Sequence, residues 1–234
     1  MSDFEQSVNK FISGLKNFQE LDLVFNPWTK SDGQYDIGEE APKIRCENLR
    51  KYLLMRENAN YILIAEAPGY QGCHFSGIPM TSERLFKNHK DIFKGMKRSS
   101  NPQKSMGQPK TVQKDGFAEP TATIVWELMV NELCIEPDNF VLWNTFAFHP
   151  HEKSNLLSNR TPCHHELKLG RKVLDEFLKL FPTQNTRKII AVGNVAKATT
   201  VNFGYAIEEE CCVRHPAYGG AKEFCSKMRQ LLEK

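Results

Sequence analysis

The sequence predicts an α/β fold, a three-layer α/β/α sandwich around a central, mainly parallel sheet of four strands. Four short apolar runs are typical of buried strands, and they lie at 61–65, 140–143, 188–192 and 209–213. Helical patterns separate these runs, and a helix between two strands forms the crossover that parallel pairing requires. The carboxyl ends of the strands should therefore open on one side of the sheet, where sites in open α/β folds lie.

Two amphipathic helices are predicted before the first strand. Apolar side chains recur at helical spacing in residues 4–15 and again in residues 49–54. We therefore expect residues 1–58 to form a helical N-terminal part of the same domain.

Helix-start signals place the later helices. Thr81 or Ser82 can cap a short helix, and Pro120 and Pro162 each stand at the start of a longer one. A short helix is expected at 193–200 after the third strand, and a last helix closes the chain.

Size and composition indicate one compact domain. At 234 residues, with 40% hydrophobic and 25% charged side chains, the chain can bury one substantial core, so we expect a single domain over 1–234. The start lacks a basic region followed by an apolar one, and no apolar run approaches the ~20 residues of a membrane helix. The seven cysteines are an odd number without a Cys-x-x-Cys pair, which indicates reduced thiols. We expect a soluble cytoplasmic monomer without a membrane partner.

Basic residues are concentrated in one segment. Residues 87–115 contain eight Lys or Arg and two Asp, so this segment carries +6 in a chain of net charge +3. Its composition predicts a mobile surface loop, an insertion over 87–117, that either contacts phosphates or is simply solvated. If it contacts phosphates, Lys97, Arg98 and Lys104 are the candidate residues.

Three polar residues follow three of the predicted strands. Glu66 stands after the first, Asn144 at the end of the second and His215 after the fourth. The predicted topology brings all three to one edge of the sheet, where they could form a pocket. Each also has a structural explanation, since Asn144 could cap the following turn and His215 could be an ordinary loop histidine.

Short motifs in the order of the strands resemble the uracil-DNA glycosylase superfamily. They are Ala65-Glu-Ala-Pro-Gly69, Phe75-Ser-Gly77, Asn144, Asn159-Arg-Thr-Pro162, Ile189-Ile-Ala-Val-Gly193 and His215-Pro-Ala217. The similarity is to the bacterial and archaeal branch whose first motif is Gly-Glu-Ala-Pro-Gly, and it spans residues 61–233. Ala65 in place of Gly and Ala217 in place of Ser depart from that branch, so the preferred base stays open.

The resemblance implies a DNA repair enzyme that flips uracil, or a related deaminated base, out of DNA and hydrolyses its N-glycosidic bond. It implies that Asn144 reads the base edge and that Phe75 stacks on the base. His215 would stabilise negative charge on the departing base. Glu66 would position the attacking water or balance charge on the sugar, or only shape its turn.

The resemblance also implies contacts around the base and along the DNA. Ala65 and Gly69 would border the base, and Tyr70 could exclude thymine. Arg214 would contact a phosphate, and Tyr218, flanked by glycines, could fill the gap that the flipped base leaves.

The iron–sulfur cysteines of that branch are missing, since Cys46 is the only cysteine in the N-terminal part and Gly170 stands where a ligand is expected. We therefore expect no cofactor. Two alternatives remain: a binding protein that has lost catalysis, and a metal-dependent hydrolase. The candidate metal ligands for the latter are His149, His151, Cys163, His164 and His165, whose spacing fits no common zinc pattern.

Overall fold

A parallel sheet of four strands lies at the centre of the computed structural model, which describes residues 2–103, 110–182 and 187–233. The strand order is β3-β2-β5-β6. The strands are β2 (Tyr61–Ala65), β3 (Phe140–Asn144), β5 (Lys188–Val192) and β6 (Cys212–Val213). All three pairings are parallel, which confirms the predicted α/β class.

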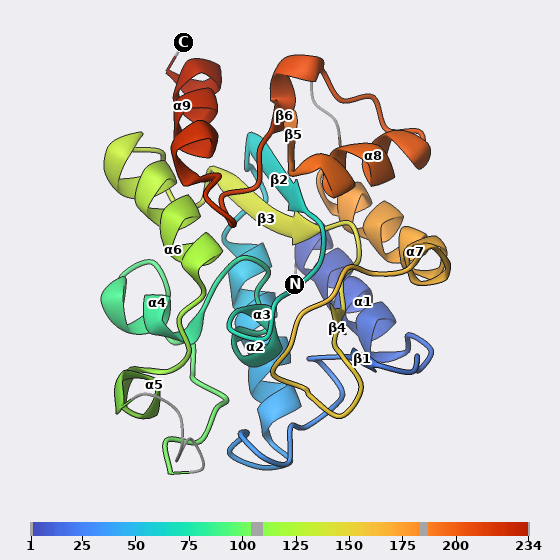
Figure 1. Ribbon diagram of the computed structural model, residues 1–234, viewed down its shortest axis with the longest axis vertical. Coiled ribbons are helices and arrows are strands. Elements are labelled where there is room, and N and C mark those ends of the chain that lie inside the picture. Colours follow the sequence, from blue (N-terminus) through green and yellow to red (C-terminus); the bar gives the residue numbers. More distant parts are fainter. Residues whose placement is uncertain (1, 104–109, 183–186, 234) are drawn as a thin grey trace.

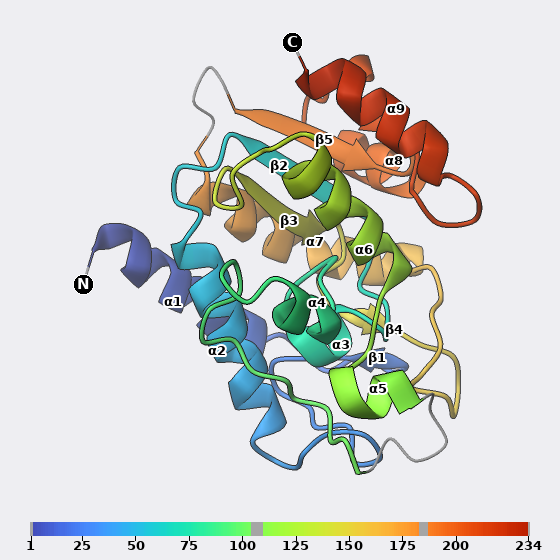
Figure 2. The ribbon, with the colours of Figure 1, turned by 90° about the vertical axis from the view of Figure 1, so that its left-hand side faces the viewer.

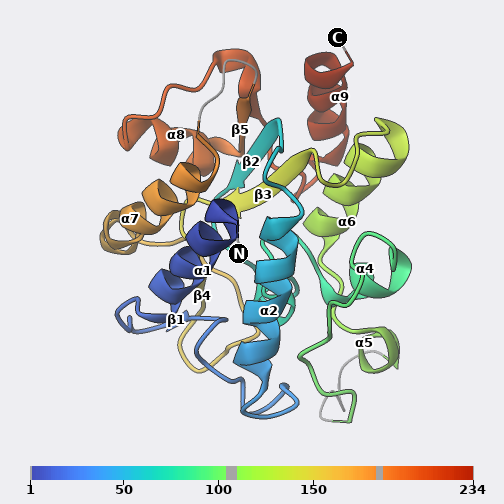
Figure 3. The same ribbon diagram turned by 180° about the vertical axis from the view of Figure 1, so that it is seen from behind.

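Helices cover both faces of the sheet (Figures 1 and 2). Seen from behind, α1 (Asp3–Lys16), α2 (Ala41–Leu54) and α7 (His164–Leu180) lie in front of the sheet (Figure 3). On the opposite face lie α6 (Pro120–Trp126) and α9 (Ala221–Leu232), while α8 (Asn194–Asn202) connects β5 to β6.

Aromatic side chains join the layers. Trp143 of β3 stacks on Phe177 of α7, with ring centroids 4.3 Å apart, and Phe11 of α1 meets the same indole edge-on at 5.3 Å. Phe140 points to the other face and contacts Trp126 of α6 at 5.0 Å. The alternation of side chains along β3 therefore builds both halves of the core.

The smaller elements were not predicted. They are the antiparallel pair β1 (Val24–Phe25) and β4 (His149–Pro150), and the short helices α3 (Cys73–Ser76) and α5 (Lys110–Asp115). Strands of two residues are too short to show an alternating pattern. The other helices include α4 (Glu83–Asn88), a π-helical extension of α6 over Glu127–Glu132 and a 3₁₀ turn over Glu209–Cys211, where the fourth strand was expected to begin. No described helix is long and apolar enough to cross a membrane.

The basic segment is partly built into the core, so the expectation that it forms only a surface loop is wrong for its described part. Ser99 and Ser100 are buried, and their backbone N–H groups donate to Glu83 Oε1 at 2.8 and 2.9 Å. The Arg98 guanidinium donates to the Val112 carbonyl oxygen. A buried carboxylate that accepts backbone donors holds this polar segment in place without an apolar face.

The edge of the sheet at β3 is closed by α2 and by Arg56, which follows it. The Tyr52 hydroxyl accepts a hydrogen bond from the Leu142 N–H at 2.8 Å, and Arg56 Nε donates to the Phe140 carbonyl oxygen at 2.9 Å. Unpaired groups on an edge strand would otherwise be left without partners in the core. These two side chains therefore fix the position of β3, which ends at Asn144.

We expect Tyr52→Phe to lower the free energy of unfolding by about 1–3 kcal/mol, because the Leu142 N–H loses its acceptor in a dry environment. Urea denaturation measures the change. Tyr61→Phe, at a half-buried position on β2, is the control and should cost less than about 0.5 kcal/mol. Equal effects of the two variants would contradict this role for Tyr52.

Candidate functional site

The ends of β2 and β3 are locked together. Ala65 is the register partner of Asn144, and the Thr145 N–H donates to the Ala65 carbonyl oxygen at 2.8 Å. The Glu66 carbonyl oxygen accepts from the Phe146 N–H at 3.0 Å and from Thr145 Oγ1 at 2.8 Å. Asn144 is therefore level with Ala65, and Glu66 follows one residue beyond it at the same edge of the sheet.

Asn144 carries a buried amide without a partner. The residue is 1% exposed, and neither Oδ1 nor Nδ2 forms a hydrogen bond with any described residue. Burying an unpaired amide costs free energy, and native structures contain few such groups. A side chain with both a donor and an acceptor unused at a strand end is therefore suited to bind a polar ligand. It does not cap the following turn.

His215 follows β6 and is held against the neighbouring strand end. A Cβ atom on Gly193 would lie 3.2 Å from His215 Cβ, so glycine after β5 permits this close packing. His215 Nδ1 accepts the Ala217 N–H at 3.1 Å, which leaves the proton of the neutral ring on Nε2. Burial lowers the pKa of His215 below its ordinary value, so the ring is a neutral Nε2–H donor at pH 7.

The turn after β2 is braced by the loop before α7. Tyr70 N–H donates to Asn159 Oδ1 at 2.9 Å. The neighbouring Arg160 forms two hydrogen bonds with Glu166, of 2.8 and 2.6 Å, and Glu166 also accepts the Cys163 N–H at the start of α7. This arrangement fixes Asn159 and, through it, the turn that contains Gly69 and Tyr70.

Phe75 lies in α3 and is fully buried. Its ring stacks on Phe117, with centroids 4.2 Å apart and planes at 4°. A base could stack on this face of Phe75 only after Phe117 had moved. The sequence did not reveal Phe117 as a neighbour, because the contact joins segments that are far apart in the chain.

Glu119 is a second residue that the sequence analysis missed. It directly precedes α6, and its carboxylate lies against the turn after β2, since Cβ atoms on Gly69 and Gly72 would lie 3.3 and 2.2 Å from its two oxygens. Oε2 is buried and has no partner among the described residues. Burial raises the pKa of Glu119 to about 7. The one signal in the sequence, Pro120 at a helix start, gives no indication that this carboxylate points inward.

Tyr218 is fully exposed in the loop between β6 and α9, which Figure 2 shows projecting from the molecule. Its φ of 52° lies in the left-handed region, which is uncommon for a tyrosine. Arg214, in the same loop, is exposed and donates to Glu223 at 2.9 Å. The loop therefore presents an aromatic side chain and a guanidinium to solvent.

The basic candidates differ in their surroundings. Lys97 is exposed. Arg98 donates to Ser100 Oγ at 2.7 Å and lies 3.5 Å from Glu83, so its guanidinium binds within the protein. The structure therefore gives Arg98 a structural role in place of the predicted phosphate contact. Lys104 lies outside the described residues.

The candidate metal ligands are not gathered into one site. His149 is buried, with Nε2 2.7 Å from the Ser158 carbonyl oxygen and Nδ1 2.9 Å from Nδ1 of His74. Cys163, like its neighbours 164 and 165, is exposed. Within the described ranges, no three His, Cys, Asp or Glu side chains are arranged to hold a metal ion.

At Gly170, a Cβ atom would lie 2.7 Å from the Phe146 ring, which explains the glycine.

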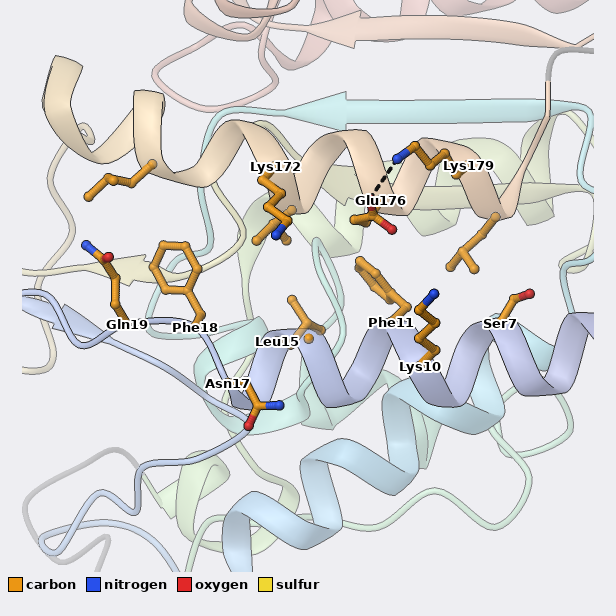
Figure 4. Close-up of a pocket in the computed structure, with 14 residues that line it drawn as sticks. Ser7, Lys10, Phe11, Leu15, Asn17, Phe18, Gln19, Lys172, Glu176 and Lys179 are labelled. Atoms are coloured by element: carbon orange, nitrogen blue, oxygen red, sulfur yellow. Dashed lines mark hydrogen bonds and ion pairs between the residues drawn. The ribbon is translucent and has the colours of Figure 1, made fainter.

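A groove of about 640 Å³ lies between α1 and α7 (Figure 4). Its lining includes the apolar Phe11, Leu15 and Val173 and the basic Lys10 and Lys172. None of the predicted site residues borders it. The groove is therefore separate from the strand-end site.

No model of a known protein family and no curated protein matches the chain. Among solved structures, the chain is similar to wild-type SMUG2 from Pedobacter heparinus, with a TM-score of 0.60 and 14% sequence identity over 100% of each chain. At this identity the similarity shows a shared fold. It confirms the sandwich architecture predicted from the strand and helix order.

A comparison of Asn144 with the hydrogen-bonded Asn48 tests whether the Asn144 amide lacks partners. Asn48, also 1% exposed, forms hydrogen bonds with the Ser76 and Lys97 carbonyl oxygens and accepts the Lys97 N–H. We expect Asn48→Ala to lower the free energy of unfolding by about 2–4 kcal/mol, and Asn144→Ala by about 1 kcal/mol or less. Chemical denaturation checks both. A loss at Asn144 as large as that at Asn48 would show that the Asn144 amide is already satisfied.

Proposed function

We propose that the protein is a DNA glycosylase that removes uracil, or a related deaminated base, from DNA and leaves an abasic site. SMUG2, whose fold the chain shares, is a member of the uracil-DNA glycosylase superfamily. A sequence identity of 14% shows a shared fold alone, so the proposed activity depends on the residues of the site.

The unpaired Asn144 amide is the observation that carries the proposal. Uracil presents an acceptor, O4, beside a donor, N3–H, and one amide can pair with both. Cytosine presents the opposite order, so an amide held in the uracil-reading orientation leaves its donor and acceptor mispaired. The free energy that folding loses by burying this amide is recovered when a base of the right pattern binds.

His215 is the candidate that acts on the departing base in the chemical step. As the C1′–N1 bond breaks, its electron pair leaves with the base, and negative charge grows on O2. The Nε2–H of a neutral imidazole can donate to that oxygen, and the interaction strengthens as the charge develops. A water oxygen forms the new bond to C1′ and loses a proton to solvent or to a carboxylate. Glu66, half-exposed at the strand end, is the candidate to orient this water or to balance positive charge on the sugar.

The loop between β6 and α9 would face the DNA. Tyr218, fully exposed in this loop, would occupy the space left in the stack, and Arg214 and Lys97 are exposed cations that can contact phosphates. Phe75 would stack on the base once Phe117 has moved away from its ring. Tyr70, whose backbone N–H is held by Asn159, would border the base. Binding of this kind depends strongly on salt and little on sequence.

Excision of uracil tests the proposal. A duplex oligonucleotide with one uracil should yield an alkali-labile site, and Asn144→Ala and His215→Ala should each lower kcat/KM by about 10²–10³-fold, because each removes a group that binds the base in the transition state. Asn202→Ala, exposed at the end of α8, is a matched control expected to leave the rate unchanged.

No abasic product from any deaminated base, with duplex binding retained, would contradict the enzyme and leave a binding protein. Full activity in both Asn144→Ala and His215→Ala would show that the reaction occurs at another site.

Tyr218 gives a separate prediction about base flipping. We expect Tyr218→Ala to slow excision from duplex DNA by about tenfold while leaving single-stranded DNA almost unaffected, because only a duplex has a stack to hold open. The ratio of kcat/KM on the two substrates measures this effect. The melting temperature should not fall, since the side chain is fully exposed. Equal losses on both substrates would exclude the wedge.

A further inference from the structure

The Glu119 carboxylate packs closely against the turn after β2, and its Oε2 has no hydrogen-bond partner among the described residues. The carboxylate lies so close to the turn that a Cβ atom on Gly72 would be 2.2 Å from Oε2. A side chain at this position would push the carboxylate away from the turn. Both of its oxygens therefore lie against the turn between Gly69 and Gly72, which joins Glu66 to α3.

The same carboxylate lacks a compensating charge. Oε2 is buried without a hydrogen-bond partner among the described residues, and burial raises the pKa of Glu119 to about 7. An ionised carboxylate in this position would be unpaired and desolvated, whereas a neutral carboxylic acid is tolerated. The neutral form is therefore the one that belongs in this contact.

No described group around Glu119 supplies a cation. On α3, the Cys73 thiol is close enough that the Glu119 carboxylate, together with burial, raises the pKa of that thiol. The loop before α7 contributes the uncharged Asn159 amide, which lies against Gly69 as the carboxylate does. From α4, Arg84 donates to the Gly116 carbonyl oxygen and not to the carboxylate.

We infer that Glu119 is a positioning residue of the proposed glycosylase site, whose neutral carboxylic acid holds the Gly69–Gly72 turn, and with it Glu66, in the shape that receives the base. This inference rests on the proposed function. Glu119 acts through the turn and takes no part in the bonds that form or break. When it ionises, the buried charge is destabilised, the carboxylate leaves the turn, and the turn loses its support.

The sign of the pH effect follows from the raised pKa. The unfolded chain loses the Glu119 proton near the ordinary value of 4.5, while the folded protein keeps it to about 7. The stabilising contribution of the neutral group is therefore fully present below pH 4.5 and is lost as the pH rises to about 7. Activity that depends on the same contact should fall as the pH rises through 7.

The test compares Glu119→Gln with Glu119→Ala on a uracil-containing duplex between pH 5 and 9. Glutamine keeps the shape of the neutral acid and cannot ionise. We expect Glu119→Gln to match the wild type within about twofold at pH 6 and to remove its decline above pH 7, because an uncharged amide does not leave the turn. Glu119→Ala should lose about 10–100-fold at pH 6, since a displaced turn misplaces reacting groups. Glu57→Gln, exposed ahead of β2 at the other end of the strand, is the matched control and should show the wild-type profile.

Two results would overturn the inference. A large loss in Glu119→Gln at every pH would mean that the carboxylate itself takes a proton in the reaction. A wild-type decline above pH 7 that persists in Glu119→Gln would mean that another group titrates.

A stability measurement separates failure of this inference from failure of the proposed function. The melting temperature of Glu119→Gln relative to wild type should rise between pH 5 and pH 7 and then level off, whatever the substrate. If the wild type releases no base but this stability difference appears, the contact stands and the glycosylase proposal fails. If base is released and the melting-temperature difference between Glu119→Gln and wild type is absent at all pH values, the inferred role of Glu119 in holding the turn is wrong.

Discussion

The register of β2 with its two neighbours is the constraint on which the site depends. β2 pairs with β3 from Tyr61 and Phe140 to Ala65 and Asn144, and it pairs with β5 on its other side. Because side chains alternate along a strand, a slip of one residue would turn the Asn144 amide to the opposite face of the sheet. Tyr52 and Arg56 hold the outer edge of β3 and so protect this register. The site is thus a consequence of how the sheet is closed at its edge.

Three features of the strand-end region cost stability. The Asn144 amide and the Glu119 carboxylate are buried without partners, and Tyr218 has a left-handed backbone. Such exceptions concentrate where a protein binds or reacts, and the rest of the fold compensates for them. Here the compensation includes the aromatic layers around Trp143. Among the described residues, buried polar atoms without a partner also occur at Arg56, Ser82, Arg84 and Trp143, so the position of Asn144 and Glu119 at the strand ends, and not their number, sets them apart.

Much of this arrangement is predictable from the sequence, and the exceptions have a common cause. The apolar runs and the crossover rule place Glu66, Asn144 and His215 at one edge, because strand direction alone decides where the ends meet. Phe117 and Glu119 approach the turn through the packing of a segment that carries no regular pattern. The same long-range packing buries Phe75, whose role in stacking looked simple from its motif. Local sequence patterns therefore predict site residues at strand ends, and they do not predict site residues that lie on irregular loops.

The Asn144 amide is unpaired, on the proposed function, because a flipped base is its partner. The most direct measurement is the side-chain ¹⁵N–¹H₂ resonance of Asn144 as a duplex containing a non-cleavable 2′-fluoro-2′-deoxyuridine is added. We expect this resonance to shift downfield on binding, as the amide donates to O4, and to remain in place with a matched duplex that contains cytosine. An Asn144 resonance that is unchanged when the uracil duplex is bound would contradict the account.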